Sequence, residues 1–267
     1  RQLLERGLIK EVDQQASTGG RRAISIVSEY KHFHTIGVRL GRYDATIALY
    51  DLSGKMLADG HYPITEPTQQ IVEQKLIAAL EDFISLHQRR IRELIAISVI
   101  LPGLVNPHSG IVHYMPHIKV DNWQLIDNLQ QHFNLTCYVG HDIRSLALAE
   151  SYFGATQDCE DSLLVRIHRG AGAGLVVNKE ILLNHRGNLG EIGHIQVDPL
   201  GELCHCGNFG CLETIASNQA IEARVKQRLE QGYTSQLTPE TSSITHICQA
   251  ANKGDPLATE VIQHVGR

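Results

Sequence analysis

The densest group of reactive side chains in the sequence lies within residues 190–217 and limits how that stretch can fold. Cys204, Cys206 and Cys211 stand within eight residues, and His194 comes ten positions before the first of them. Three thiolates and one imidazole fill the four tetrahedral positions that Zn²⁺ prefers and leave none open for a catalytic water. The spacing therefore predicts a closed, structural zinc site.

Two other interpretations of the cysteines stay open at this point, namely a disulfide between two of them or a set of free buried thiols. Glu191 and Glu213 flank the cluster. A zinc ion would fix the backbone that carries both carboxylates and could so position them for a ligand. Either one alone could equally cap a helix or face solvent.

Composition bounds the class of protein. The chain has 267 residues, 42% of them hydrophobic, so it can bury a substantial core and form two medium domains. No apolar run approaches the roughly 20 residues of a membrane span, and the first residues lack a signal peptide's apolar core. Three of the six cysteines are clustered at metal-binding spacing, which indicates a reducing compartment. We therefore expect a cytoplasmic protein with no membrane partner.

The first 27 residues carry a net charge of +2, although the whole chain carries −5. They read as a helix end, a strand at 8–12, a polar Gly-Gly turn and a returning strand at 23–27. This pattern resembles the last helix and the wing of a winged helix-turn-helix, and it predicts that Arg21 and Arg22 contact DNA phosphates. The rest of that domain is missing, so we expect the sequence to start inside it. A plain surface hairpin is the alternative.

Hydrophobic periodicity predicts α/β architecture for the remainder. The expected elements of the first half are two strands and the start of a third between residues 34 and 57, a helix at 68–90, a strand at 94–101, a helix at 123–133, a strand at 137–139 and a helix at 144–153.

The second half continues the alternation. We expect a strand at 163–167, a Gly-rich turn at 168–174, strands at 175–177 and 181–183, and helices at 218–231, at 243–251 and from about 256. The predicted domains are the wing remnant at 1–28, a first lobe at 29–142 and a second lobe at 143–267 that is incomplete at its C-terminus.

Polar groups follow two of the predicted buried strands. Pro102–Gly103 and His141–Asp142 each stand where such a strand ends. In α/β sheets, ligands bind at the carboxyl ends of parallel strands, so these residues are candidates for a binding site. Taken alone, Asp142 is better explained as the N-cap of the helix that follows.

Five segments, ILPGLVNP, GHDIRSLALAE, GAGAGLV, EIGHIQVDP and CHCGNFGCLE, resemble the ROK family of repressors and sugar kinases. The resemblance covers nearly the whole chain. It implies a two-lobed ribonuclease-H-like or actin-like (sugar kinase) fold with a zinc-binding loop, preceded by a partial winged helix-turn-helix. The zinc motif together with the wing points to the repressor branch.

For a repressor of this kind, the resemblance implies a homo-oligomer, dimer or tetramer, that represses genes for N-acetylglucosamine uptake and catabolism. It implies release from operator DNA when N-acetylglucosamine 6-phosphate binds. The family's sugar contacts carry over to Gly103, the His141–Asp142 pair, Glu191, His194 and Glu213, with His141 standing where the kinases have Asn. His194 could ligate zinc with one ring nitrogen and the sugar with the other.

The chain departs from the family's kinases where ATP phosphates would bind. An acidic residue and a Gly-Gly-Thr turn are replaced by residues 39–43, RLGRY, and a Gly-Thr-Gly turn by residues 168–170, HRG. We therefore expect no enzyme activity, with Asp142 a vestigial base. The gained cations Arg39, Arg42, His168 and Arg169 could hold the effector's 6-phosphate, or they could be solvated surface groups.

Two other functions stay open. One is a ROK-type N-acetylhexosamine kinase, and the other is a sugar-sensing scaffold whose main partner is a transport protein instead of DNA.

Overall fold

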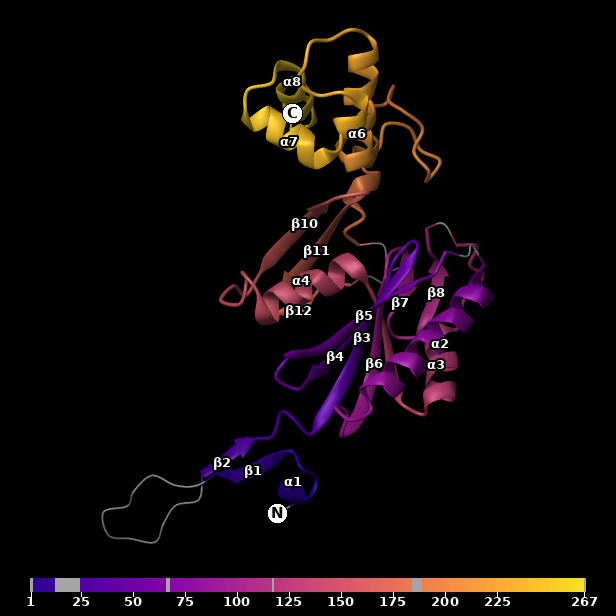
Figure 1. Cartoon of the computed structure of the whole chain (residues 1–267), viewed down its shortest axis with the longest axis vertical. Helices are drawn as coiled ribbons and strands as arrows, with labels where there is room; N and C mark the ends of the chain where they lie inside the picture. The colour runs from indigo at the N-terminus through magenta and orange to yellow at the C-terminus, as the bar shows by residue number, and fades with distance from the viewer. Residues whose placement is uncertain (1, 13–24, 66–67, 117, 184–188, 267) are drawn as a thin grey trace, which may run out of the picture. The chain divides into compact units, whose positions relative to one another are not determined.

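A computed structural model describes residues 2–12, 25–65, 68–116, 118–183 and 189–266 (Figure 1). The chain divides into two compact units, Arg1–Asp142 and Ile143–Arg267. None of the helices within these described ranges is long and apolar enough to cross a membrane.

The first unit begins with a short helix and a hairpin. Helix α1 (Gln2–Glu5) leads into β1 (Ile9–Val12), which pairs antiparallel with β2 (Ser25–Ser28), as the sequence predicts. The two predicted DNA contacts, Arg21 and Arg22, lie outside the described residues. The interpretation of this hairpin as a DNA-binding wing therefore stays a prediction.

The body of the first unit is a five-stranded sheet in the order β5-β4-β3-β6-β9. Strands β3, β4 and β5 form an antiparallel meander, whereas β3, β6 and β9 run parallel. The strand bounds are β3 Phe33–Leu40, β4 Asp44–Asp51, β5 Met56–Pro63, β6 Glu93–Leu101 and β9 Thr136–His141. A small hairpin of β7 (Leu104–Asn106) and β8 (Ile111–Tyr114) follows β6.

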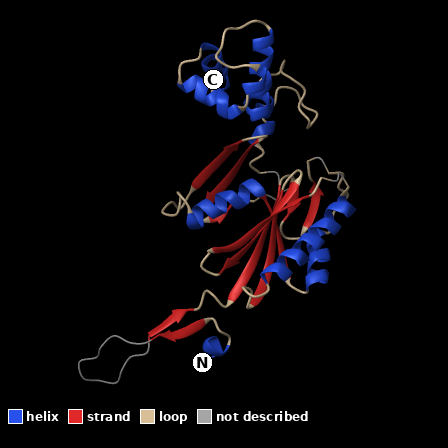
Figure 2. Ribbon diagram, in the orientation of Figure 1, coloured by secondary structure: helices blue, strands red, loops and turns tan. Residues whose placement is uncertain are grey.

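Helices α2 (Gln69–His87) and α3 (Leu125–Phe133) lie side by side on one face of this sheet (Figures 1 and 2). The apolar positions of α2 recur at helical spacing and are buried at Val72, Leu76, Ala79, Leu80 and Phe83. They pack with alternate residues of the strands and with the buried ring of Trp123 into one core. Burial of this apolar face is what stabilises the layered unit.

The second unit joins a small sheet to a helical cluster. The antiparallel strands β10 (Ser162–Ile167), β11 (Ala171–Val177) and β12 (Glu180–Ile181) form the sheet, and helix α4 (Asp142–Phe153) packs on β11. A 3₁₀ turn, η1 (Ile192–His194), and helix α5 (Leu212–Ala216) follow. Helices α6 (Asn218–Glu230), α7 (Ile244–Asn252) and α8 (Pro256–Val265), with η2 (Pro239–Thr241), enclose a second core.

One sequence-based expectation about this unit is wrong. Residues 171–174 of the predicted Gly-rich turn belong to β11, and the turn is confined to 168–170. The small residues are needed because α4 packs closely on the strand. A Cβ added at Gly174 would lie 2.5 Å from the Cβ of Ala147, and one at Gly172 would lie 2.3 Å from Cδ1 of Ile143.

Candidate functional site

The parallel strands of the first unit bring several predicted site residues to one edge of the sheet. Arg39 lies opposite Ile100 in the β3–β6 pair, and Leu101 lies opposite His141 in the β6–β9 pair. Arg39, Gly103 and Asp142 therefore all stand at the carboxyl ends of adjacent parallel strands. This is the edge where α/β sheets bind ligands.

Gly103 has a structural reason to be glycine. Its φ is +114°, and a Cβ there would lie 2.1 Å from the carbonyl oxygen of Tyr114. Any other residue would collide with the backbone of the β7–β8 hairpin. The glycine thus keeps this turn tight directly after β6.

His141 and Asp142 form a close pair between β9 and α4. The Nδ1 atom of His141 lies 3.6 Å from Oδ1 of Asp142, and the two side chains are only 8% and 16% exposed. Asp142 is the first residue of α4, where the helix dipole favours a negative charge. Its carboxylate is therefore well placed to accept hydrogen bonds.

Arg39 meets an acidic neighbour in the structure. Its Nη1 atom lies 3.9 Å from Oδ2 of Asp44, which also lies 3.6 Å from Nδ1 of His61. Arg42 places its guanidinium 4.8 Å from the ring centroid of Tyr43. An anion bound by Arg39 would have to compete with Asp44, because both would interact with the same guanidinium.

In the second unit, the fold brings the four predicted zinc ligands together. His194 ends η1, Cys204 and Cys206 lie on the following loop, and Cys211 stands directly before α5. Their ligand atoms all lie within 4.8 Å of one another. Three backbone hydrogen bonds close the loop around them, from Cys204 N to Asn208 O, from Gly207 N to Cys204 O and from Gly210 N to Glu202 O.

The distances in this cluster match what a tetrahedral zinc ion requires. Zinc–sulfur bonds of about 2.3 Å separate two sulfur ligands by about 3.8 Å. The Sγ atoms of Cys206 and Cys211 are 3.7 Å apart, and Sγ of Cys204 lies 3.6 Å from Nδ1 of His194. The cluster could therefore hold a metal ion, and Nδ1 is the nitrogen of His194 that faces it.

The thiols of the cluster differ in their tendency to ionise. Burial raises the pKa of Cys204 to about 12 and also raises the pKa of Cys211. The backbone N–H of Asn208 stabilises the Cys206 thiolate, which lowers the pKa of that thiol. A metal ion binding here would have to displace protons from the two buried thiols.

The structure adds one residue that the sequence analysis missed. Nδ1 of His205 lies 2.7 Å from Oε1 of Glu213. The same oxygen accepts a hydrogen bond from the Cys204 thiol at 3.4 Å and lies 3.9 Å from His194 Nδ1. The only signal in the sequence was the position of His205 between two predicted ligands in the motif Cys-His-Cys. His194, His205 and Glu213 also form a second set that could hold a metal ion.

The turn at 168–170 lies beside Glu213. A Cβ at Gly170 would be 3.0 Å from Oε2 of Glu213, and the carbonyl of His168 accepts a hydrogen bond from the backbone of Asn218 at 2.7 Å. Arg169 is exposed on this turn. Glu213 thus has one oxygen directed to the cysteine loop and the other to the turn.

Glu191 directly precedes η1, and its carbonyl accepts a hydrogen bond from the backbone of His194 at 3.1 Å. The predicted sugar contacts are consequently divided between the units. Gly103, His141 and Asp142 belong to the first, and Glu191, His194 and Glu213 belong to the second.

Comparisons with known proteins agree on the family. The model of the ROK family matches residues 35–267. The chain is 67% identical over its entire length to the DNA-binding transcriptional dual regulator NagC of Escherichia coli (strain K12), of which it covers 66%. It is 35% identical over its whole length to the transcriptional repressor Mlc of the same organism, again covering 66% of that protein.

Two solved structures are similar across most of the chain. A ROK family transcriptional regulator described as a homologue of the E. coli MLC protein is 42% identical, with a TM-score of 0.91 over 99% of this chain and 67% of its own. A ROK family glucokinase from Streptomyces griseus, solved with glucose and AMPPNP, is 27% identical, with a TM-score of 0.71 over 87% of this chain and 75% of its own.

The chain spans about two thirds of the length of the curated relatives it matches. Its α/β fold is the one shared by the family's repressors and sugar kinases. With the family model covering all but the first 34 residues, this chain belongs to the ROK family.

Proposed function

We propose that this chain is the sugar-sensing part of a transcriptional repressor of N-acetylglucosamine uptake and catabolism genes, which N-acetylglucosamine 6-phosphate releases from operator DNA. The observation that carries the proposal is the 67% identity, over all 267 residues of this chain, to proteins called N-acetylglucosamine repressor. A repressor acts on chromosomal DNA, so the proposal includes a cytoplasmic location. It also includes a homo-oligomer, as the family resemblance implies.

We further propose that His194, Cys204, Cys206 and Cys211 hold a structural Zn²⁺ ion. The inter-ligand distances of 3.6 and 3.7 Å support this donor set. When bound, the ion would supply a cross-link between η1, the cysteine loop and the start of α5. Because Nδ1 of His194 faces the cysteines, its Nε2 is left to donate a hydrogen bond to a sugar hydroxyl.

The recognition of the sugar would rest on carboxylates. Each carboxylate of Asp142, Glu191 and Glu213 can accept two hydroxyl hydrogen bonds, in the planar geometry that a pyranose ring offers. Gly103 would contribute the backbone of the tight turn after β6, which only glycine permits beside the Tyr114 carbonyl. His205 would hold the Glu213 carboxylate in place from the side of the cysteine loop.

The 6-phosphate would be held by cations that replace the kinases' phosphate turns, namely Arg39, His168 and Arg169. Arg39 suits a phosphate monoester because its guanidinium donates two parallel hydrogen bonds. Its ion pair with Asp44, at 3.9 Å and half exposed, is weak enough to be exchanged for a dianion. Release from DNA then requires that the effector bind the DNA-incompetent arrangement more tightly than the competent one.

A kinase is the second candidate function, because the similar Streptomyces griseus structure is a glucokinase, and in that case Asp142 would be the base. The stretch Arg39–Tyr43 argues against kinase activity. It presents cations and a bulky ring where phosphoryl transfer needs a small turn and an acid near the metal-bound phosphates.

Isothermal titration of the zinc-loaded chain tests the proposed function. We expect N-acetylglucosamine 6-phosphate to bind, and unphosphorylated N-acetylglucosamine and glucose to bind at least about tenfold more weakly, because they lack the charge-assisted phosphate contacts. Glu213→Gln should weaken binding, whereas Glu202→Gln, an exposed glutamate on the same loop, should not. Equal affinity for the free sugar, together with ATP consumption in its presence, would favour the kinase instead.

A further inference from the structure

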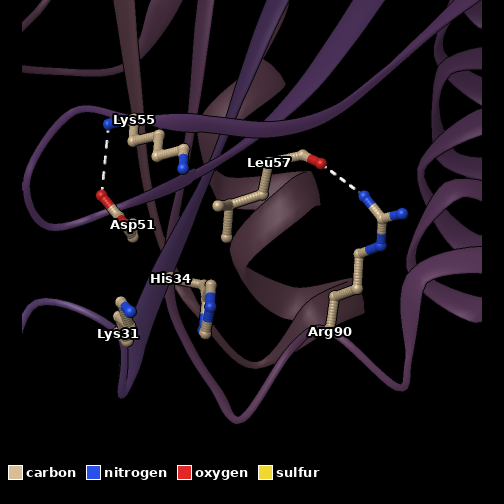
Figure 3. Close-up of a pocket in the computed structure, with 6 residues that line it drawn as sticks. All are labelled: Lys31, His34, Asp51, Lys55, Leu57 and Arg90. Carbon is tan, nitrogen blue, oxygen red and sulfur yellow. Dashed lines mark hydrogen bonds between the residues drawn. The ribbon is translucent and has the colours of Figure 1, made fainter.

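The first unit contains a cavity at the end of its sheet opposite to Gly103, His141 and Asp142. Its volume is about 290 Å³, and it is lined by Lys31, His34, Asp51, Lys55, Leu57 and Arg90 (Figure 3). The lining residues come from the start of β3, the β4–β5 turn and the end of α2. None of them was singled out by the sequence analysis, and none belongs to the set assigned above.

The cavity has a buried floor and a cationic rim. His34 is 2% exposed and Asp51 is 6% exposed, whereas Lys31, Lys55 and Arg90 are all exposed. The three cations and one carboxylate of the lining give a formal net charge of +2. That charge matches the −1.5 to −2 of a phosphate monoester near pH 7.

The single carboxylate of the lining is already occupied. Oδ1 of Asp51 accepts hydrogen bonds from the hydroxyl of Ser53 at 2.5 Å, from its backbone N–H at 2.9 Å and from the backbone N–H of Lys55 at 3.1 Å. Burial opposes ionisation of Asp51, but these bonds outweigh it and lower its pKa. Asp51 therefore fixes the β4–β5 turn, and its negative charge attracts the Lys55 ammonium, which lines the same cavity.

Two further groups present donors to the cavity. Nδ1 of His34 accepts a hydrogen bond from the backbone N–H of Arg92 at 3.4 Å, so the neutral ring carries its proton on Nε2. Arg90 uses Nη1 to donate to the carbonyl of Leu57 at 2.5 Å, which anchors the guanidinium at the rim (Figure 3). Its remaining N–H groups can still donate, because a guanidinium carries five.

The other charged groups near the rim are paired with one another. Glu29 forms an ion pair with Lys10 at 2.8 Å and accepts a hydrogen bond from the backbone of Lys31. Glu93 lies 3.3 Å from Nε2 of His32. Neither carboxylate lines the cavity, so Asp51 is the one acidic residue among its lining residues.

We propose that this cavity binds a small phosphate-bearing ligand, held by Lys31, Lys55 and Arg90 above the His34 imidazole. The size fits a phosphate with a small substituent better than a larger cofactor, because most ligand pockets are about 300 Å³ or larger. This site is separate from the proposed sugar site and does not depend on the proposed function.

Binding of a ligand here would also restrict the motion of the residues that connect the β1–β2 hairpin to the sheet. That connection, residues 29–32, already docks through the backbone of Leu52, which donates to Tyr30 O at 3.1 Å, and of Glu93, which donates to His32 O at 3.2 Å. Because Lys31 lies on the connection and Lys55 and Arg90 lie on the body of the unit, a shared anion would bridge the two.

Amide NMR of the 267-residue chain tests the proposal, with inorganic phosphate titrated against chloride at constant ionic strength. We expect saturable shifts at Lys31, His34, Lys55 and Leu57. The double variant Lys31→Gln/Lys55→Gln should weaken phosphate binding at least about tenfold, since it removes two charge-assisted contacts. Both side chains are exposed, so the variant should keep the wild-type spectrum elsewhere.

A neighbouring pair of arginines supplies the matched control. Arg90→Ala should weaken phosphate binding, whereas Arg89→Ala removes an exposed cation of the same helix end that does not line the cavity and should leave binding unchanged. Glycerol phosphate and a short DNA duplex distinguish the possible sources of the phosphate. Absence of saturable shifts with phosphate and glycerol phosphate, or equal binding by the lysine variant, would overturn the proposal. Duplex binding alone, lost in that variant, would overturn it too and would assign the cations to the DNA backbone.

Discussion

Glu213 is the residue through which the cysteine loop and the proposed sugar site meet. Its Oε1 is shared by His205 and the thiol of Cys204, and its Oε2 faces the turn that ends at Gly170. A carboxylate held at one oxygen and open at the other keeps a fixed orientation without a ligand. Such preorganisation lowers the entropic cost of binding.

His205→Gln tests this positioning role. The variant removes the 2.7 Å contact with Glu213, and we expect the affinity for N-acetylglucosamine 6-phosphate to fall about fivefold, or ~1 kcal/mol, since His205 is half exposed. Calorimetry measures the affinity, and the zinc content should stay unchanged. Loss of zinc in this variant would instead make His205 a ligand.

At the scale of elements, the loop that carries the cysteines depends on glycines with positive φ. Gly207 and Gly210 have φ values of +91° and +60°. A Cβ at Gly210 would lie 1.5 Å from the carbonyl oxygen of Asp198, whereas one at Gly207 would meet nothing within 4 Å. Alanine at Gly207 would therefore cause backbone strain alone, whereas alanine at Gly210 would cause strain and a steric collision.

Gly210→Ala should prevent the loop from closing and reduce the bound zinc to well below one ion per chain. Gly207→Ala should retain the metal and lower stability only by the strain of a left-handed alanine, ~1 kcal/mol. Metal analysis and thermal melting of both variants provide the measurement. Equal zinc loss in both would mean that strain, and not collision, governs the loop.

The helical cluster of the second unit is organised around the buried Asp255. Its carboxylate caps α8 through the backbone N–H of Ala258 at 2.9 Å and accepts from the Ser235 hydroxyl and the Gln236 backbone. Burial opposes the charge, but these donors prevail and the pKa of Asp255 is lowered. The stabilisation is therefore present above the unfolded-state pKa of about 3.9 and is lost as the pH falls through the lowered folded value.

Asp255→Asn should destabilise the cluster at neutral pH by ~2 kcal/mol, because the amide turns a donor toward donors. The difference from the wild type should shrink below about pH 4, where the wild-type carboxyl also protonates. Denaturant unfolding across pH gives the comparison, with the exposed Asp158→Asn as control. A constant difference at all pH values would contradict an ionised cap.

At the scale of the whole molecule, the described part of the chain contains two hydrophobic cores. One lies between the five-stranded sheet and its two helices, and the other lies among α6, α7 and α8. The cysteine cluster lies in the second unit, so the loss of a metal ion should lower the stability of that unit first.

Chelation of the purified chain should lower its melting temperature by at least about 5 °C. Hydrogen exchange should accelerate in β11, η1 and α5 but remain unchanged in α2 and β6. The Cys211→Ser variant is the control and should show no further loss with chelator. An unchanged melting curve would remove the zinc proposal while leaving the fold intact.

Much of the architecture could be predicted from local patterns. The helix expected at 68–90 is α2 at Gln69–His87, and the strand expected at 94–101 is β6 at Glu93–Leu101. The Gly-rich stretch was assigned wrongly because glycine usually marks turns, whereas here it permits close packing of α4 on β11. That packing involves residues about 30 positions apart in the chain, which a local pattern does not reveal.

The sequence by itself determined most of the longer helices and strands and the cysteine cluster, because periodicity and ligand spacing are local properties that act over fewer than about 20 residues. The β7–β8 hairpin was not predicted. Only the tertiary structure decided that β3 lies between β4 and β6, that His205 contacts Glu213, and that Lys31, Lys55 and Arg90 surround one cavity. These arrangements arise when apolar faces from distant segments are buried together. The polar groups that they carry are then placed side by side by the packing of the core.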